Sequence, residues 1–86
     1  SDNGPWGWAG INGGSAGLLR GAKGSPWEGG FRVPAIAWMP GTVPDKSSSD
    51  AIASAMDLFP TFLALAGIDL AAYTDLDGIN IIKTFT

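Results

Sequence analysis

The sequence contains no cysteine and no histidine among its 86 residues. The chain therefore cannot form a disulfide or a zinc site with the usual ligands, which are common staples of small domains. It also lacks a histidine general base and a cysteine nucleophile, and we recognise no serine in a nucleophile elbow. If this chain belongs to an enzyme, another segment has to supply the nucleophile.

Charged residues are scarce as well, at 15% against an ordinary ~25%. Apolar residues reach 45%, with four tryptophans and four phenylalanines, so the chain is expected to pack rather than to be disordered. Because so few charges cannot coat a small sphere, part of the surface is expected to be covered by more protein. The remainder of a parent catalytic domain is the predicted partner.

The distribution of charged and apolar residues argues against a nucleic-acid partner and against a membrane span. Net charge is −3, and the five basic residues are scattered instead of forming a stripe, so no nucleic-acid partner is expected. The longest apolar runs fall far short of the ~20 residues needed to cross a bilayer, so no membrane span is predicted.

The texture of the sequence changes along the chain. Residues 1–30 hold most of the glycines and no regular periodicity, which predicts a long ordered loop anchored by tryptophans. Residues 31–41 are apolar and end in Pro-Gly, which predicts a buried strand and a turn. Residues 57–67 have helical spacing, closed by Gly67. Residues 68–86 are expected to be an irregular tail.

Two groups of residues are candidates for chemistry. Asp2 and Asn3 offer adjacent hard oxygen donors of the kind that Ca²⁺ or Mg²⁺ prefers, although the pair alone is also typical of an Asx-turn. Lys23 lies between flexible glycines and could meet a phosphate or sulfate, or it could be an ordinary solvated lysine.

Four other charged residues are predicted to be structural. Glu28 and Arg32 could pair across a tight bend, which suits a scaffold better than catalysis. Asp57 is interpreted as a helix cap and Asp77 as part of a turn.

Taken together, several blocks of the sequence resemble the arylsulfatase family, the formylglycine-dependent sulfatases. The blocks are SDNGP at residues 1–5, GLLRGAKGSPWEGGFRVP at 17–34, WMPG at 38–41, the stretch 56–67, and DGIN at 77–80. Their order and spacing match the family across nearly the whole chain. The resemblance identifies residues 1–86 as the carboxyl-side part of an incomplete sulfatase catalytic domain.

The resemblance implies an alkaline-phosphatase-like α/β fold and hydrolysis of sulfuric esters by the full-length parent. Asp2 and Asn3 match the family's divalent cation ligands, usually for Ca²⁺, with Mg²⁺ as the alternative. Lys23 matches the lysine that contacts the substrate sulfate and acts in catalysis. The nucleophile, a formylglycine made in a motif far upstream, is expected outside this chain, so the chain alone is expected to be inactive.

Three points stay open at this level. The substrate could be a sulfate-ester small molecule or a sulfated glycan. A phosphate or phosphonate ester hydrolase of the same superfamily, or a non-catalytic module that binds an anion or carbohydrate, remains the alternative function. The family resemblance suggests a periplasmic, secreted or lysosomal location.

Overall fold

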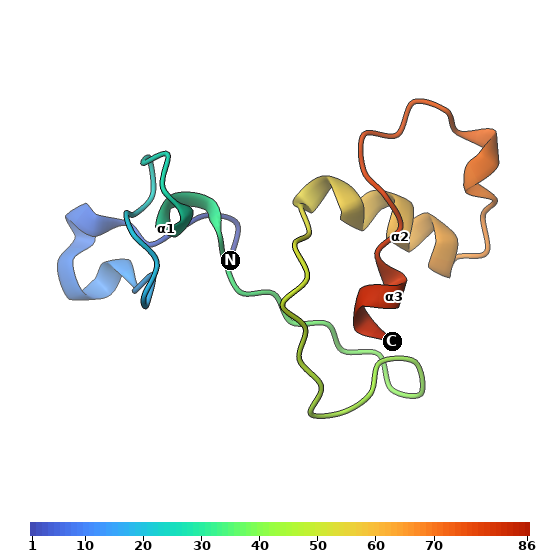
Figure 1. Cartoon of the computed structure of the whole chain (residues 1–86), viewed down its shortest axis with the longest axis horizontal. Helices are drawn as coiled ribbons and strands as arrows, with labels where there is room; N and C mark the ends of the chain where they lie inside the picture. Colours follow the sequence, from blue (N-terminus) through green and yellow to red (C-terminus); the bar gives the residue numbers. More distant parts are fainter. The chain divides into compact units, whose positions relative to one another are not determined.

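Short helices joined by irregular segments make up the chain, which a computed structural model describes from Ser1 to Thr86 (Figure 1). The chain divides into two compact units, Ser1–Ile36 and Ala37–Thr86. Unit 1 contains the 3₁₀ segment η1 (Gly7–Gly13), which a kink at Gly10 divides into two short turns, and the single-turn helix α1 (Glu28–Phe31). Unit 2 contains η2 (Ala55–Asp57), α2 (Leu58–Leu65), η3 (Leu70–Ala72) and α3 (Ile82–Phe85).

Unit 1 is built around the buried glycine pair Gly29 and Gly30 of α1. The Gly30 carbonyl accepts a hydrogen bond from Gly4 N at 2.9 Å, and Gly29 N donates to the Arg20 carbonyl at 2.7 Å. A Cβ at Gly29 would collide with the carbonyl groups of Gly21 and Arg20. Only glycine lets these backbones approach so closely. The pair therefore holds the beginning of the chain and the loop after Leu19 in one body.

Helix α2 organises unit 2, and both of its ends carry recognisable signals. Ser54 and Asp57 form a capping box just before it. Pro60 lies in the first turn, where its missing N–H leaves no bond unmade. At the other end Gly67 adopts a left-handed φ of 78°, while Gly67 N and Ile68 N donate to the carbonyls of Ala64 and Leu63. This is a Schellman ending, and α2 lies within the range 57–67 predicted to be helical.

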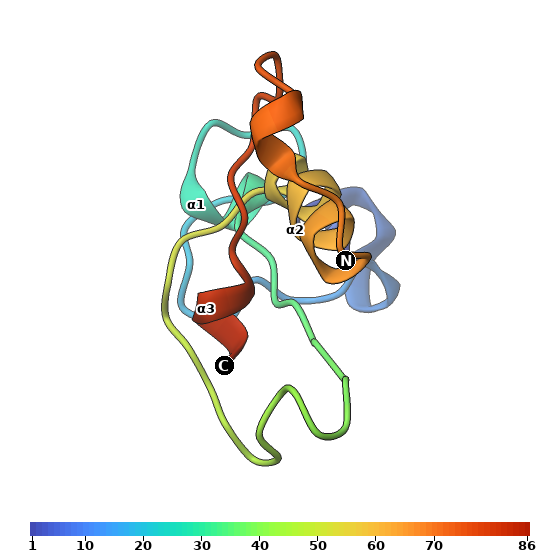
Figure 2. The ribbon, with the colours of Figure 1, turned by 90° about the vertical axis from the view of Figure 1, so that its right-hand side faces the viewer.

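The C-terminal segment of unit 2 runs back past α2, as Figures 1 and 2 show. Thr61 Oγ1 accepts a hydrogen bond from Ile81 N at 2.9 Å and donates one to the Asp57 carbonyl at 2.6 Å. Thr61 and Ile81 are only 2% and 6% exposed, so this contact is dry. It fixes the predicted irregular tail, which also contains the short helices η3 and α3.

The buried strand predicted for residues 31–41 is wrong in this structure. Phe31 ends α1, and the residues from Arg32 to Met39 form no regular element. A strand needs a neighbouring strand to pair its backbone groups, and the chain contains no strand. Ile36 and Trp38 are 95% and 85% exposed, so the segment is not buried either. The turn at its end does form, since Thr42 N and Val43 N both donate to the Met39 carbonyl.

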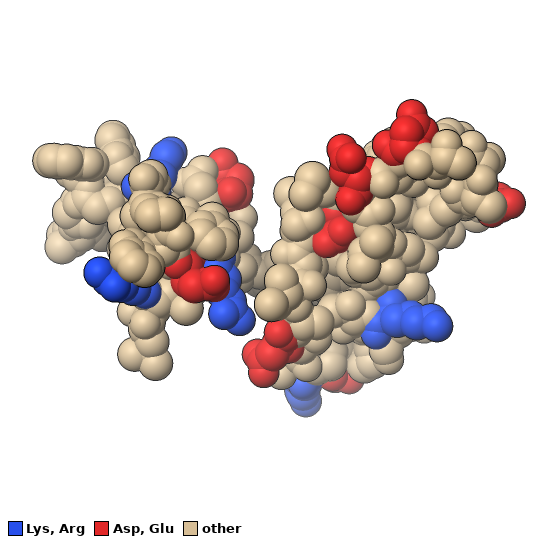
Figure 3. Space-filling model, turned by 45° about the horizontal axis from the view of Figure 1, so that its top comes forward, with Lys and Arg blue, Asp and Glu red and all other residues tan.

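The surface of both units is largely apolar. On the face shown in Figure 3, acidic and basic groups are scattered among wide uncharged areas. Large side chains such as Trp8, at 93% exposed, project into solvent, and few side chains are fully buried. No helix has the length and apolar character needed to cross a membrane.

Candidate functional site

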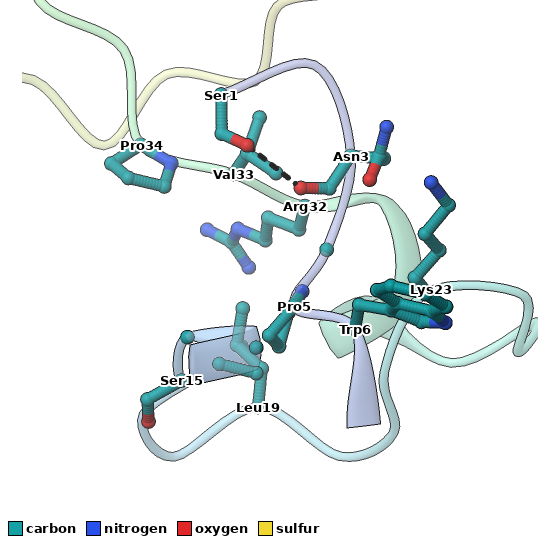
Figure 4. Close-up of a pocket in the computed structure, with 14 residues that line it drawn as sticks. Ser1, Asn3, Pro5, Trp6, Ser15, Leu19, Lys23, Arg32, Val33 and Pro34 are labelled. Atoms are coloured by element: carbon teal, nitrogen blue, oxygen red, sulfur yellow. Dashed lines mark hydrogen bonds between the residues drawn. The ribbon is translucent and has the colours of Figure 1, made fainter. Parts of the chain in front are cut away.

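A hollow of about 590 Å³ lies within unit 1 (Figure 4). Its size is within the range of sites for small molecules. The polar and charged side chains on its wall come from four separate stretches of sequence. They are Ser1, Asn3, Ser15, Lys23 and Arg32, and the apolar ones are Pro5, Trp6, Ala16, Leu19, Val33 and Pro34.

Asn3 lines this hollow and Asp2, which is exposed, does not. The two side chains touch, because Asn3 Nδ2 donates a hydrogen bond of 2.8 Å to Asp2 Oδ2. Ser1 Oγ donates to the Asn3 carbonyl at 2.9 Å. The bond from Asn3 to Asp2 leaves Asp2 Oδ1 and Asn3 Oδ1 available as acceptors, and both are hard oxygen donors.

Lys23 lines the hollow from the loop between η1 and α1. Its backbone N–H donates to the Pro5 carbonyl at 2.8 Å, which ties the loop to the segment that carries Asn3. In Figure 4 the side chains of Asn3 and Lys23 extend to the same side of the ribbon. Lys23 takes no part in a salt bridge within the chain. The structure thus brings two of the three predicted site residues, Asn3 and Lys23, to one hollow.

Arg32 was predicted to be scaffold and proves to have two contacts. It pairs with Glu28 over 3.4 Å, which confirms the predicted pair, although this long contact joins two exposed side chains of one helical turn. Arg32 also lines the hollow, so it adds a second positive charge there. The sequence signal that could have placed Arg32 at the hollow is its position in the glycine-rich block, just after Gly29 and Gly30.

Trp6 and its neighbour Pro5 form part of the apolar wall of the hollow. From the sequence, the tryptophans of residues 1–30 were expected to anchor a long loop. Pro5 and Trp6 come after Gly4 in the chain, and the hydrogen bond from Gly4 N to the Gly30 carbonyl ties this segment to α1.

Ser15 also lines the hollow, and contrary to the sequence prediction it lies in a Gly-x-Ser-x-Gly pattern, at residues 13–17. The structural context of a nucleophile elbow is missing, because no strand precedes Ser15 and no helix follows it directly. Its Oγ accepts a hydrogen bond from Gly17 N at 3.0 Å. With no histidine in the chain to act as its base, Ser15 is best explained as a turn residue.

Asp57 is a structural carboxylate, as predicted, but its contacts differ from those of a simple helix cap. It makes no side-chain bond to α2 and instead accepts hydrogen bonds from Ile79 N at 2.9 Å and Ser54 N at 2.7 Å. The Ile79 amide, followed by the Ser54 amide, lowers the pKa of Asp57. The ionised carboxylate therefore joins the start of α2 to the C-terminal segment.

The donor set supplies only part of a cation site. No group of three or more acidic, histidine or cysteine side chains gathers anywhere in the chain. Ca²⁺ takes six to eight oxygen ligands. Asp2 and Asn3 can offer hard oxygens to such an ion, so they fit part of its shell.

Comparison with known proteins agrees with the resemblance. A sequence model of the sulfatase family matches residues 1–68. Arylsulfatase G of Rattus norvegicus is 42% identical over 90 aligned positions, which cover 93% of this chain and 17% of that protein. Arylsulfatase A of Bos taurus is 44% identical over 81 positions, covering 94% of this chain and 16% of the relative.

A third relative, N-acetylgalactosamine-6-sulfatase of Homo sapiens, is 44% identical over 72 positions, covering 84% of this chain and 14% of the relative. The chain thus spans about a sixth of the length of the curated relatives that it matches. No solved structure matches it. From the match over residues 1–68 and the identity to arylsulfatases, we conclude that the chain belongs to the sulfatase family.

Proposed function

We propose that the full-length protein hydrolyses sulfuric esters and that residues 1–36 form part of its active site. The observation that carries the proposal is that Asn3 and Lys23 line one hollow, tied together by the bond from Lys23 N to the Pro5 carbonyl. In a member of the sulfatase family, these residues match the metal ligand and the sulfate-contacting lysine. The chain then belongs to a larger alkaline-phosphatase-like α/β domain.

Lys23 binds and orients the substrate in this proposal. A sulfate ester carries a negative charge on its terminal oxygens, and further charge develops on the leaving oxygen as the ester bond breaks. The Lys23 ammonium has no carboxylate partner within the chain, so it is available to the anion. Arg32 adds positive charge to the same wall. Removing one such electrostatic contact costs on the order of 10²-fold or more in rate.

Asp2 and Asn3 hold a divalent cation, Ca²⁺ or alternatively Mg²⁺, together with ligands from the rest of the domain. When bound, the cation draws negative charge from the ester oxygens. The hydrogen bond from Asn3 Nδ2 to Asp2 Oδ2 fixes the two side chains relative to each other, so that their remaining oxygens are presented together. The nucleophile is a formylglycine contributed by another part of the protein.

The apolar walls receive the organic part of the ester. Pro5, Trp6 and Leu19 offer a surface on which an aromatic or sugar ring can pack. The curated relatives are named as arylsulfatases and an N-acetylgalactosamine-6-sulfatase. The substrate is accordingly a sulfate-ester small molecule or a sulfated glycan.

The test compares nitrophenyl sulfate with nitrophenyl phosphate as substrates of the purified full-length protein. We expect sulfate hydrolysis that is lost on chelation and returns with Ca²⁺, and that is strongly reduced in Asp2→Ala and Asn3→Ala. A clear preference for the phosphate ester would assign the protein to the phosphate hydrolases of the superfamily. Absence of hydrolysis of either ester, with the metal bound, would instead favour a module that binds anions without catalysis.

A further inference from the structure

The loop that carries Lys23 is closed by a contact that no part of the proposed chemistry uses. The guanidinium carbon of Arg20 lies 3.7 Å from the centre of the Trp27 ring. This distance is well within the range of a cation–π contact, and arginine stacks well on tryptophan. The two residues stand at the two ends of the stretch 20–27, with Lys23 between them.

The same loop is closed a second time by backbone bonds. The Arg20 carbonyl accepts from Gly29 N at 2.7 Å, next to the Trp27 end of the loop. Inside the loop, Ser25 N donates to the Ala22 carbonyl at 2.9 Å, and Ala22 N donates to Ser25 Oγ at 3.2 Å. These bonds set the backbone at Lys23 and leave its flexible side chain without a polar partner of its own.

Packing is tight at the base of the loop. Gly21 has a φ of 88°, and a Cβ there would collide with Ser25 Oγ and with Trp27 Cβ. The Trp27 side chain is thus pressed against the backbone that leads into Lys23. Loss of the stack frees the Trp27 ring, which is already 47% exposed, to leave this position.

We propose that Arg20 and Trp27 are positioning residues that hold the Lys23 ammonium at the sulfate. The proposal rests on the proposed function, because it assumes that Lys23 contacts the substrate. Arg20 does not line the hollow, so we expect no direct contact between its guanidinium and a ligand bound there. Arg20 and Trp27 together form the Arg20–Trp27 clip.

The clip predicts a loss in kcat with little change in KM. Arg20→Ala in the full-length protein should lower kcat for nitrophenyl sulfate by about 5- to 50-fold, because a misplaced catalytic group loses part of its effect while remaining present. KM should change less than about 2-fold, since the contact is strongest in the transition state. Trp27→Leu should lower kcat to a similar extent. Trp27→Phe keeps an aromatic face for Arg20 and should retain most of the wild-type kcat.

A double-mutant cycle with Lys23 separates positioning from a general structural effect. If the clip acts through Lys23, adding Arg20→Ala to Lys23→Ala should change kcat by less than about 2-fold. The same fold-loss in both backgrounds would overturn the proposal, as would full activity of Arg20→Ala. If Arg20→Ala does not fold, Trp27→Phe and Trp27→Leu take its place in the same cycle, each with and without Lys23→Ala. The loss of kcat in Trp27→Leu relative to Trp27→Phe should then disappear in the Lys23→Ala background. A wild-type protein without sulfatase activity would refute the proposed function instead.

Discussion

Replacing Thr61 by valine should detach the C-terminal segment from α2. Valine keeps the shape and branching of threonine but has no hydroxyl, so it removes the oxygen that accepts the Ile81 amide over 2.9 Å. Thr61 is 2% exposed and Ile81 is 6% exposed, so water has poor access to the orphaned N–H. An unsatisfied buried donor costs about 1–3 kcal/mol.

That cost translates into a measurable change in local opening. At about 1.36 kcal/mol for each factor of ten, the protection of the Ile81 amide against hydrogen exchange should fall by roughly 5- to 150-fold. Exchange is followed in the full-length protein by mass spectrometry on peptides that cover residues 78–86. Thr61→Ser keeps the hydroxyl and is the matched control, with protection close to that of the wild type. Unchanged protection in Thr61→Val would refute the reasoning.

Two further variants test contacts within unit 1 and within unit 2, respectively. Gly29→Ala places a Cβ against the carbonyls of Gly21 and Arg20 and should destabilise the full-length protein by about 1–3 kcal/mol in a denaturant titration. Gly7→Ala is the control and should have little effect, because its Cβ would meet only Ala22 Cβ at 3.9 Å. Equal stability of the two variants would contradict this account of the glycine pair. The pKa of Asp57 is lower in the folded chain than in the unfolded chain, so its contribution to stability is present above the unfolded value of about 3.9 and is lost as pH falls through the folded pKa. The wild type should therefore be more stable than Asp57→Asn at neutral pH, and the two unfolding midpoints should converge under acid; a constant difference down to low pH would show that the carboxylate charge is unimportant.

Local signals in the sequence were sufficient for α2 and for the turn after Met39. Each signal for α2 acts on residues close to it in the sequence. These signals are the spacing of leucine and phenylalanine, Pro60 in the first turn and Gly67 at the end. The apolar stretch 31–41 carries equally clear strand composition, yet a strand depends on a pairing partner that lies outside its own sequence. Within this chain no partner exists, and the segment stays irregular.

The contacts that shape the site are long-range and could not be predicted from local patterns. The bond from Lys23 N to the Pro5 carbonyl joins a loop to the start of the chain, and the Gly4–Gly30 bond spans 26 residues. The adjacency of Asn3 and Lys23 was expected only from the family resemblance. The positions of Arg32 on the wall of the hollow and of Arg20 over Trp27 follow from the fold around the glycine pair.

The most direct measurement is the rate at which the Lys23→Ala variant of the full-length protein hydrolyses nitrophenyl sulfate at saturating Ca²⁺. Lys83, an exposed lysine of α3 in the other unit, provides the matched control Lys83→Ala. We predict that Lys23→Ala loses on the order of 10²-fold or more in kcat, while Lys83→Ala stays within about 2-fold of wild type, as expected for a surface substitution. Near-wild-type hydrolysis by a folded Lys23→Ala protein would contradict the assignment of this lysine to the sulfate.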